Sequence, residues 1–180
     1  MITYSGEAFH AGGRAHPTIT AMIRTTAIAV SCLAAAAFSA CGSDDPPETP
    51  TACLAPARAY LSALASVPDP VRLADGTPIG ACLIDGQAAG PLAQVGEAMV
   101  AAATELNRRV RDRAPARAAV ELGYLVGAAE DAGSATGGIH RDLILRLESA
   151  ARYGGTGDEP LPESFERAFE VGYAAGRSGA

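Results

Sequence analysis

The sequence contains no tryptophan and no lysine, and aromatic residues make up only 5% of its 180 residues. Sites that bind sugars or bases by stacking need aromatic faces, so this scarcity argues against such functions. Acidic residues outnumber the arginines, and the formal net charge is −6. Non-specific nucleic-acid binding requires a basic surface, so we expect no nucleic-acid partner.

Histidine and cysteine are also scarce, which limits metal chemistry. The chain has three histidines and four cysteines, and His140 is the only histidine after residue 41. Together with Cys53 and Cys82 it supplies too few ligands for a structural zinc site. The spacing of these two cysteines is also far from the Cys-x-x-Cys of redox enzymes. We therefore expect no metal ion and no other cofactor.

Long hydrophobic runs are missing as well. The most apolar stretch, residues 27–37 (AIAVSCLAAAA), is far shorter than the ~20 residues needed to span a bilayer. Arg24 precedes this stretch and small residues follow it, in the order that a secretory signal requires. The pattern predicts export from the cytoplasm.

The export segment ends in Phe38-Ser39-Ala40-Cys41, which resembles the lipobox of bacterial lipoproteins. Ser39, Ala40 and Cys41 match that box, whereas Phe38 stands where a leucine is usual. The resemblance implies cleavage after Ala40 and a diacylglyceryl group on the Cys41 thiol. Acyl chains such as palmitate would then hold the protein on the extracytoplasmic face of the cell membrane or outer membrane. An ordinary cleaved signal with a coincidental cysteine is the alternative.

The predicted export signal and lipid-attachment site divide the chain into four segments. The first residues lack signal character, and Met22 stands where a signal begins, so we interpret Met1 as a mis-assigned start. The residues that follow Cys41 are acidic and proline-rich, which predicts an extended chain without a core. The segments are a mis-assigned start, a signal peptide, a disordered tether and a helical domain: residues 1–21, 22–40, 41–51 and 52–178.

Apolar residues recur every three or four positions through most of the last segment, which predicts helices. Prolines mark several of their starts and ends. The expected helices span residues 52–67, 91–113, 115–132, 139–153 and 161–177. Between the first two, turn signals at 75–76 and 85–86 predict a short hairpin or structured loop. The predicted fold class is all-α, a small bundle of about five helices with this insert.

Cys53 and Cys82 are the cysteines that remain once the signal is removed and Cys41 is acylated. In an oxidising compartment we expect one disulfide between them. Because it closes a loop of about 29 residues, the chain-entropy relation predicts roughly 3.5 kcal/mol of stabilisation.

A short sequence motif occurs in both the third and the fifth expected helices. Gly123 and Gly127 stand 49 residues before Gly172 and Gly176, and each pair frames a Gly-Tyr-x-x-Gly segment. Glycine costs ~1 kcal/mol inside a helix, but glycines four apart share a face that another helix can approach closely. We hypothesise that helices two–three and four–five are related hairpins with these faces packed together. Chance in a chain rich in glycine and alanine is the alternative.

An arginine run closes the second expected helix. A functional interpretation is contact with anionic lipid or another polyanion. Glu105 and Asp112 lie within the same stretch, so we expect an ordinary solvated helix end instead. The arginines are Arg108, Arg109, Arg111 and Arg113.

His140 is the one weak candidate for a functional site. It follows Gly137-Gly138 at a helix start, beside Arg141 and Asp142. These residues could form an anion site from free backbone N–H groups or a general base oriented by a carboxylate. Neither arrangement has a defined partner, and a loop histidine near a helix cap is the simpler interpretation.

We predict a lipid-anchored, extracytoplasmic and non-enzymatic module of the cell envelope that binds an unknown envelope protein or ligand. One alternative is a small envelope hydrolase or other enzyme that uses His140. Another is a helical subunit of a transport or signalling assembly. An accessible His140 near a carboxylate would favour the enzyme. An exposed apolar patch would favour an interaction module, and a closed cavity between helices would favour a small-ligand binder.

Overall fold

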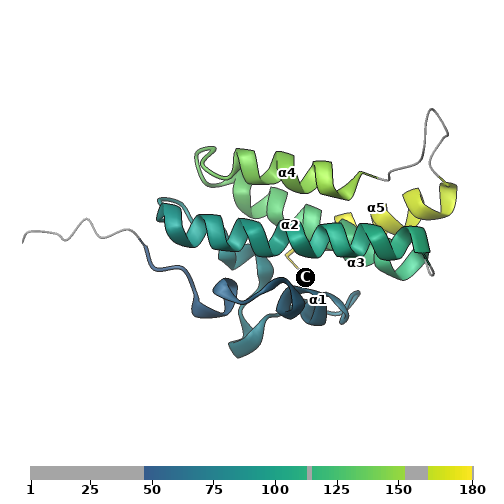
Figure 1. Ribbon diagram of the computed structural model, residues 1–180, viewed down its shortest axis with the longest axis horizontal. Helices are drawn as coiled ribbons and strands as arrows, with labels where there is room; N and C mark the ends of the chain where they lie inside the picture. The colour runs from purple at the N-terminus through teal and green to yellow at the C-terminus, as the bar shows by residue number, and fades with distance from the viewer. Residues whose placement is uncertain (1–46, 113–114, 153–161, 180) are drawn as a thin grey trace, which may run out of the picture. The chain divides into compact units, whose positions relative to one another are not determined.

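The computed structural model describes residues 47–112, 115–152 and 162–179, and this part of the chain is a small helical bundle (Figure 1). The all-α prediction is confirmed. The helices are α1 (Ala57–Leu64), α2 (Ala89–Asp112), α3 (Pro115–Ser134), α4 (Arg141–Ala151) and α5 (Glu163–Arg177). Three short 3-10 helices precede α2: η1 (Thr51–Leu54), η2 (Ala74–Gly76) and η3 (Ile79–Cys82).

The insert between α1 and α2 is a structured loop. Its one β-bridge among the described residues joins Arg72 to Pro78, and the short helices η2 and η3 lie on either side of Pro78. Asp75 accounts for the turn, because its backbone adopts a φ of 60° and its carboxylate accepts hydrogen bonds from the Thr77 backbone and hydroxyl. The residues after this turn do not continue as the second strand of a hairpin but coil as η3, which buries Ile79 and Cys82.

The predicted start, signal peptide and lipid-attachment Cys41 lie outside the described residues, as does the tether up to residue 46. The end of the predicted tether belongs to the folded domain. Thr49 is buried, and its hydroxyl accepts a 2.8 Å hydrogen bond from the Gln87 side-chain nitrogen. The domain therefore begins before residue 52. The buried Gln87 amide needs a hydrogen-bond partner, and Thr49 of this polar segment provides it.

Helix α3 is the centre of the bundle. It contacts α1, α2, α4, α5 and η3. Residues 121–129 are buried without interruption, as expected of a helix that is covered on all sides. In Figure 1, α2 crosses in front of α3, with α4 above it and α1 below.

The main core lies where α1, α2, α3 and α4 meet the insert. Each fully buried aliphatic side chain contributes ~1.5–3 kcal/mol from the removal of apolar surface from water. The largest of these buried apolar side chains are Tyr60, Leu64, Ile79, Met99, Leu106, Leu122, Leu125 and Leu147.

Helix α5 packs against α3 backbone to backbone. A Cβ atom at Gly123 would overlap the carbonyl oxygen of Phe169, and one at Gly127 would overlap that of Tyr173. The relation is mutual, because Gly172 and Gly176 lie equally close to carbonyl oxygens of α3. Both glycine pairs thus belong to a single α3–α5 contact, whereas α4 packs mainly against α2 and α3.

Candidate functional site

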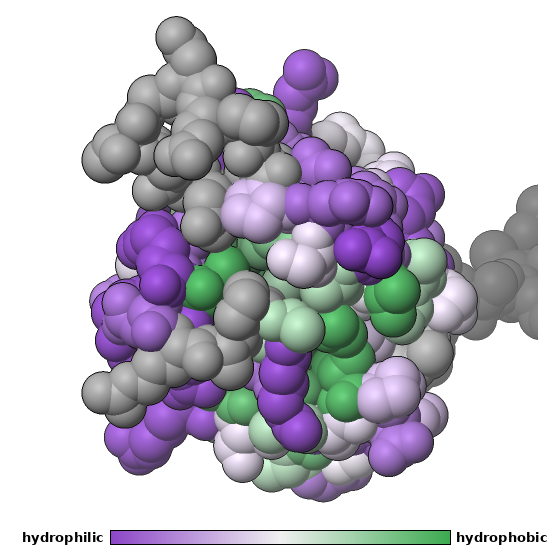
Figure 2. All heavy atoms as spheres, turned by 90° about the vertical axis from the view of Figure 1, so that its right-hand side faces the viewer, coloured by the Kyte–Doolittle hydropathy of each residue, from purple (hydrophilic) through white to green (hydrophobic). Residues whose placement is uncertain are grey.

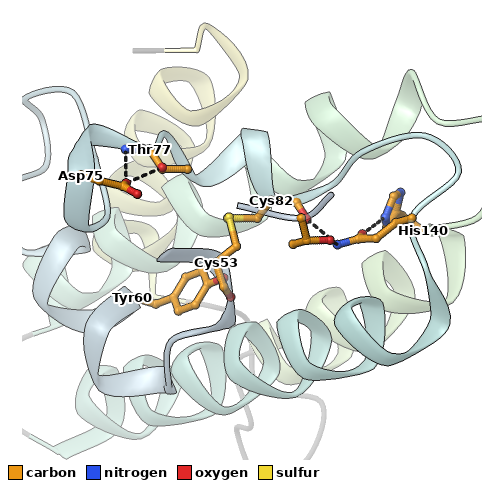
Figure 3. Close-up of a disulfide and its surroundings, with 8 residues drawn as sticks. Cys53, Tyr60, Asp75, Thr77, Cys82 and His140 are labelled. Carbon is orange, nitrogen blue, oxygen red and sulfur yellow. Dashed lines mark hydrogen bonds between the residues drawn. A yellow bond between two sulfur atoms is a disulfide. The ribbon is translucent and has the colours of Figure 1, made fainter. Parts of the chain in front are cut away.

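The disulfide joins Cys53 in η1 to Cys82 in η3, with the two Cα atoms 5.3 Å apart (Figure 3). Both cysteines are fully buried. The Tyr60 hydroxyl donates a 2.7 Å hydrogen bond to the Cys53 carbonyl, and burial raises the pKa of this phenol. The bridge fastens the insert to the segment before α1, so it is a structural element.

His140 lies at the N-terminal cap of α4 and is fully buried. Its Nδ1 is 2.8 Å from the Thr136 hydroxyl, and its Nε2 is 2.8 Å from the Gln87 side-chain oxygen. The Gln87 nitrogen donates to the Cys82 carbonyl and to the Thr49 hydroxyl, which fixes the direction of the amide. The Gln87 oxygen can only accept, so Nε2 of His140 carries a proton.

Burial lowers the pKa of His140, and the more distant charge of Asp85 opposes this only in part. Both side chains that bond the ring are uncharged. An anion site and a general base each require an accessible imidazole, and this ring has no exposed surface. His140 therefore connects the insert to the turn between α3 and α4, and it is a structural residue.

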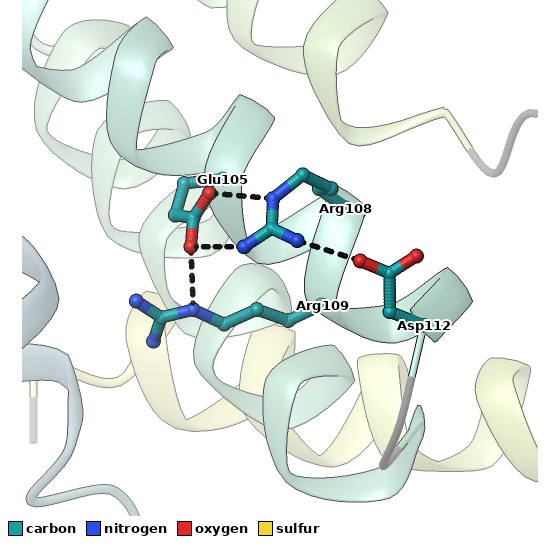
Figure 4. Close-up of polar contacts among 4 residues, drawn as sticks. All are labelled: Glu105, Arg108, Arg109 and Asp112. Carbon is teal, nitrogen blue, oxygen red and sulfur yellow. Dashed lines mark hydrogen bonds and ion pairs between the residues drawn. The ribbon is translucent and has the colours of Figure 1, made fainter.

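Two arginines of the run at the end of α2 are paired with carboxylates of the same helix (Figure 4). Arg108 pairs with Glu105 at 2.8 Å and with Asp112 at 2.6 Å, and Arg109 pairs with Glu105 at 2.9 Å. The pKa of Glu105 is lowered to about 2, most by the hydrogen bond from Arg108 and next by the hydrogen bond from Arg109. Arg111 donates to Asn107, and Arg113 lies outside the described residues.

An open groove of about 700 Å³ lies between α3, α4 and α5. We call it the acidic groove. Its volume falls in the range of small-ligand sites, ~300–1,000 Å³. Three aromatic side chains of α5 line it together with four glutamates and one arginine: Phe165, Phe169, Tyr173, Glu130, Glu148, Glu166, Glu170 and Arg152. The end of the bundle that carries the start of α5 faces the viewer in Figure 2, where apolar surface lies between polar clusters.

The aromatic rings of α5 form a row. The ring centroids of Phe165 and Phe169 are 5.9 Å apart, and those of Phe169 and Tyr173 are 6.2 Å apart with nearly parallel planes. The Tyr173 hydroxyl donates to the Glu130 carboxylate, and this hydrogen bond is the main reason that the pKa of Tyr173 is raised. At the same end the Arg177 guanidinium lies over the Tyr173 ring, 5.9 Å from its centroid.

No family model, curated protein or solved structure matches this chain. The chemistry of the molecule is therefore inferred from its own geometry. Among the described residues there is no cluster of three or more histidine, cysteine and acidic side chains that could hold a metal ion. None of the helices in these ranges has both the length and the hydropathy to cross a bilayer.

The acidic groove was not anticipated from the sequence, although one signal for it is present. Phe165, Phe169 and Tyr173 are spaced four apart. By itself this stripe predicts only large side chains on the apolar face of a helix. Glu166 and Glu170 form a second stripe directly beside it. An apolar stripe flanked by an acidic one marks the edge of a buried face, which is where a groove can open.

Proposed function

We propose that this protein is a lipid-anchored binding module of the cell envelope, with its helical domain held outside the cytoplasm. The observation that carries the binding assignment is the acidic groove, which is open, aromatic and lined by glutamates from three helices. Clefts with an apolar lining and a few polar groups are the usual form of a binding site.

The cell-envelope address is supported by the order of features before the domain. A positive residue, a short apolar run and small residues precede Cys41, and an acidic, proline-rich segment follows it. The disulfide between Cys53 and Cys82 agrees with an oxidising compartment, because such bonds are rare in reducing cytosol.

Binding is favoured over catalysis by the position of His140. The ring is hydrogen-bonded to the uncharged side chains of Thr136 and Gln87. It is fully buried and therefore cannot contact a substrate. Catalysis needs several positioned groups around a reacting atom. The groove offers carboxylates and a phenol whose arrangement suits a cationic ligand better than a reaction.

The anchor is tested by expressing the full coding sequence in a bacterial host, with Cys41→Ala as the control. We expect the wild-type chain to begin at Cys41, to carry diacylglycerol and further acyl mass, and to partition into detergent. The Cys41→Ala protein should remain unprocessed or lack lipid. Intact-mass spectrometry and phase partitioning measure both properties, and an unmodified Cys41 in the wild type would overturn the anchoring.

The same preparation reports the redox state of the domain. Alkylation of the mature protein under denaturing conditions should label Cys53 and Cys82 only after reduction, because both sulfurs are committed to the disulfide. Labelling without reduction would place the domain in a reducing compartment and contradict the proposed address.

A further inference from the structure

The acidic groove carries a strong local charge. Four glutamates line it against a single arginine, Arg152. Within the described part of the chain, the carboxylates of Glu148, Glu166 and Glu170 make no ion pair or hydrogen bond. By contrast, the carboxylates around the arginine run of α2 are paired. The groove therefore has a negative potential that a cationic ligand would neutralise.

The chain already places one guanidinium at the end of this groove. Arg177 lies over the Tyr173 ring, donates to its hydroxyl at 3.3 Å, and lies 3.7 Å from the Glu130 carboxylate. Aromatic face and carboxylate thus hold a guanidinium together. The neighbouring Phe169 ring, stacked on Tyr173, repeats the aromatic half of this arrangement, and Glu166 and Glu170 supply further carboxylates.

We propose that the acidic groove binds an extended, arginine-bearing peptide segment, with apolar side chains against the partly exposed rings of Phe169 and Tyr173 and guanidinium groups paired with the unpaired carboxylates of Glu148, Glu166 and Glu170. This inference rests on the proposed binding function and does not depend on the lipid at Cys41. From Phe165 to Tyr173 the groove follows α5 for about 12 Å at 1.5 Å per residue. An extended peptide of about four residues covers that length.

A peptide fits better than a single small cation because the carboxylates are distributed. Glu148 comes from α4, Glu130 from α3, and Glu166 and Glu170 from α5. One guanidinium can pair with one of these side chains in a bidentate manner. Several charges on one flexible segment can pair with Glu148, Glu166 and Glu170 together, since Glu130 is already bonded to Tyr173 and Arg177. Arginine is favoured over lysine because its planar guanidinium also stacks on aromatic rings.

The test is a titration of the full-length, detergent-solubilised protein, followed by the anisotropy of a fluorescently labelled peptide. The probe is a short synthetic peptide of alternating arginine and leucine. Two matched peptides replace every arginine by lysine or by glutamate. We expect saturable binding of the arginine peptide, several-fold weaker binding of the lysine peptide and none of the glutamate peptide. Affinity for the arginine peptide should fall as salt is raised, because partly exposed ion pairs are screened.

Variants locate the binding to the groove. Glu166 and Glu170 are exposed, so Glu166→Gln and Glu170→Gln should leave the fold intact. Each single substitution should lower the affinity for the arginine peptide about three-fold, and the double substitution about ten-fold, as expected for partly solvated ion pairs. Phe169→Leu keeps an apolar side chain without a ring, and it should reduce the preference for arginine over lysine. The matched control is Glu97→Gln, an exposed carboxylate of α2 outside the groove, which should change nothing.

Besides the absence of binding, three outcomes would overturn the inference. They are equal binding of the glutamate peptide, an equal loss of affinity in Glu97→Gln, and binding of N-acetyl-arginine amide as tightly as the whole peptide. The last would make the ligand a small cation. A lipidated protein that binds no arginine peptide removes this inference and leaves the anchor intact. An unlipidated protein that binds the peptide does the reverse.

Discussion

The ring of His140 is buried in a network that can accommodate either of its protonation states. The Thr136 hydroxyl lies 2.6 Å from the Gly133 carbonyl as well as 2.8 Å from Nδ1 of His140. With a neutral ring the hydroxyl donates to Nδ1. With a protonated ring it accepts from Nδ1–H and donates to Gly133. Hydrogen bonding is therefore complete in both states, and burial alone makes the charged state unfavourable.

We predict that this histidine makes the protein less stable in mild acid. Its pKa in the folded state is lowered by burial, so the unfolded chain takes up a proton near pH 6.5 before the folded one does. Stability is therefore lost as pH falls below about 6.5. In His140→Gln the dependence of the urea midpoint on pH between about 7 and 5 should become shallower.

The His140→Gln protein should also be less stable at neutral pH, by about 1–3 kcal/mol, because the substitution leaves a buried partner without its hydrogen bond. Asp85→Asn is the matched control for charge near the ring. Asp85 is exposed and raises the pKa of His140, so its removal should steepen the acid loss slightly. Identical pH profiles for the wild type and His140→Gln would contradict the assignment.

At the scale of elements, the α3–α5 contact depends on glycine at four positions. Gly172→Ala places a methyl group on the carbonyl oxygen of Val120. A backbone atom cannot relieve this overlap by changing rotamer, as a side chain can. We expect the free energy of unfolding to fall by about 1–3 kcal/mol or more, despite the better helix propensity of alanine. Thermal denaturation followed by circular dichroism measures the change.

Gly80→Ala is the control for this substitution. A Cβ atom at Gly80 would lie 3.5 Å from the Ala132 Cβ, which is ordinary van der Waals contact. Its melting temperature should stay close to that of the wild type. Equal melting temperatures for Gly172→Ala and the wild type would mean that α3 and α5 are not in close contact.

Elements with a regular period were predictable, because a buried stripe and a terminal proline are local properties of the sequence. Helix α2, for example, begins at Ala89, two residues before the expected start at Pro91. The insert was less predictable, because its backbone is set by a disulfide and by burial of Ile79 and not by its own alternation. The role of Thr49 was hidden for a similar reason, since its partner Gln87 lies 38 residues away.

The sites differ from the helices in this respect. His140 was visible as a lone histidine, but Gln87 is 53 residues from it in sequence and gave no sign of pairing. The aromatic half of the acidic groove lies on α5 and could be seen as a stripe. Its glutamates come from three helices, and only the packing of those helices brings them together.

At the scale of the whole molecule, one covalent bond joins the start of the domain to the insert before α2. The disulfide spans 29 residues, and removing it should lower the free energy of unfolding by roughly 3 kcal/mol because the unfolded chain gains freedom. The variant is the double substitution Cys53→Ala and Cys82→Ala, compared with the wild type by urea denaturation.

A reducing agent provides the control for this change. It should lower the urea midpoint of the wild type towards that of the double variant, and it should leave the variant itself unchanged. A double variant as stable as the wild type would show that the α-helical core holds the insert without the bridge.

The position of the disulfide also determines how the domain responds to mechanical load. If the chain is tethered at Cys41, a pull from the membrane reaches the fold through Thr49 and then Cys53. Beyond that point the force crosses the sulfur–sulfur bond to Cys82 and continues through residues 83–88 into α2. The 29-residue span between them, about 100 Å when extended, bears no tension. Helix α1 and the part of the insert that precedes Cys82 are thus shielded from stretching for as long as the bond is intact.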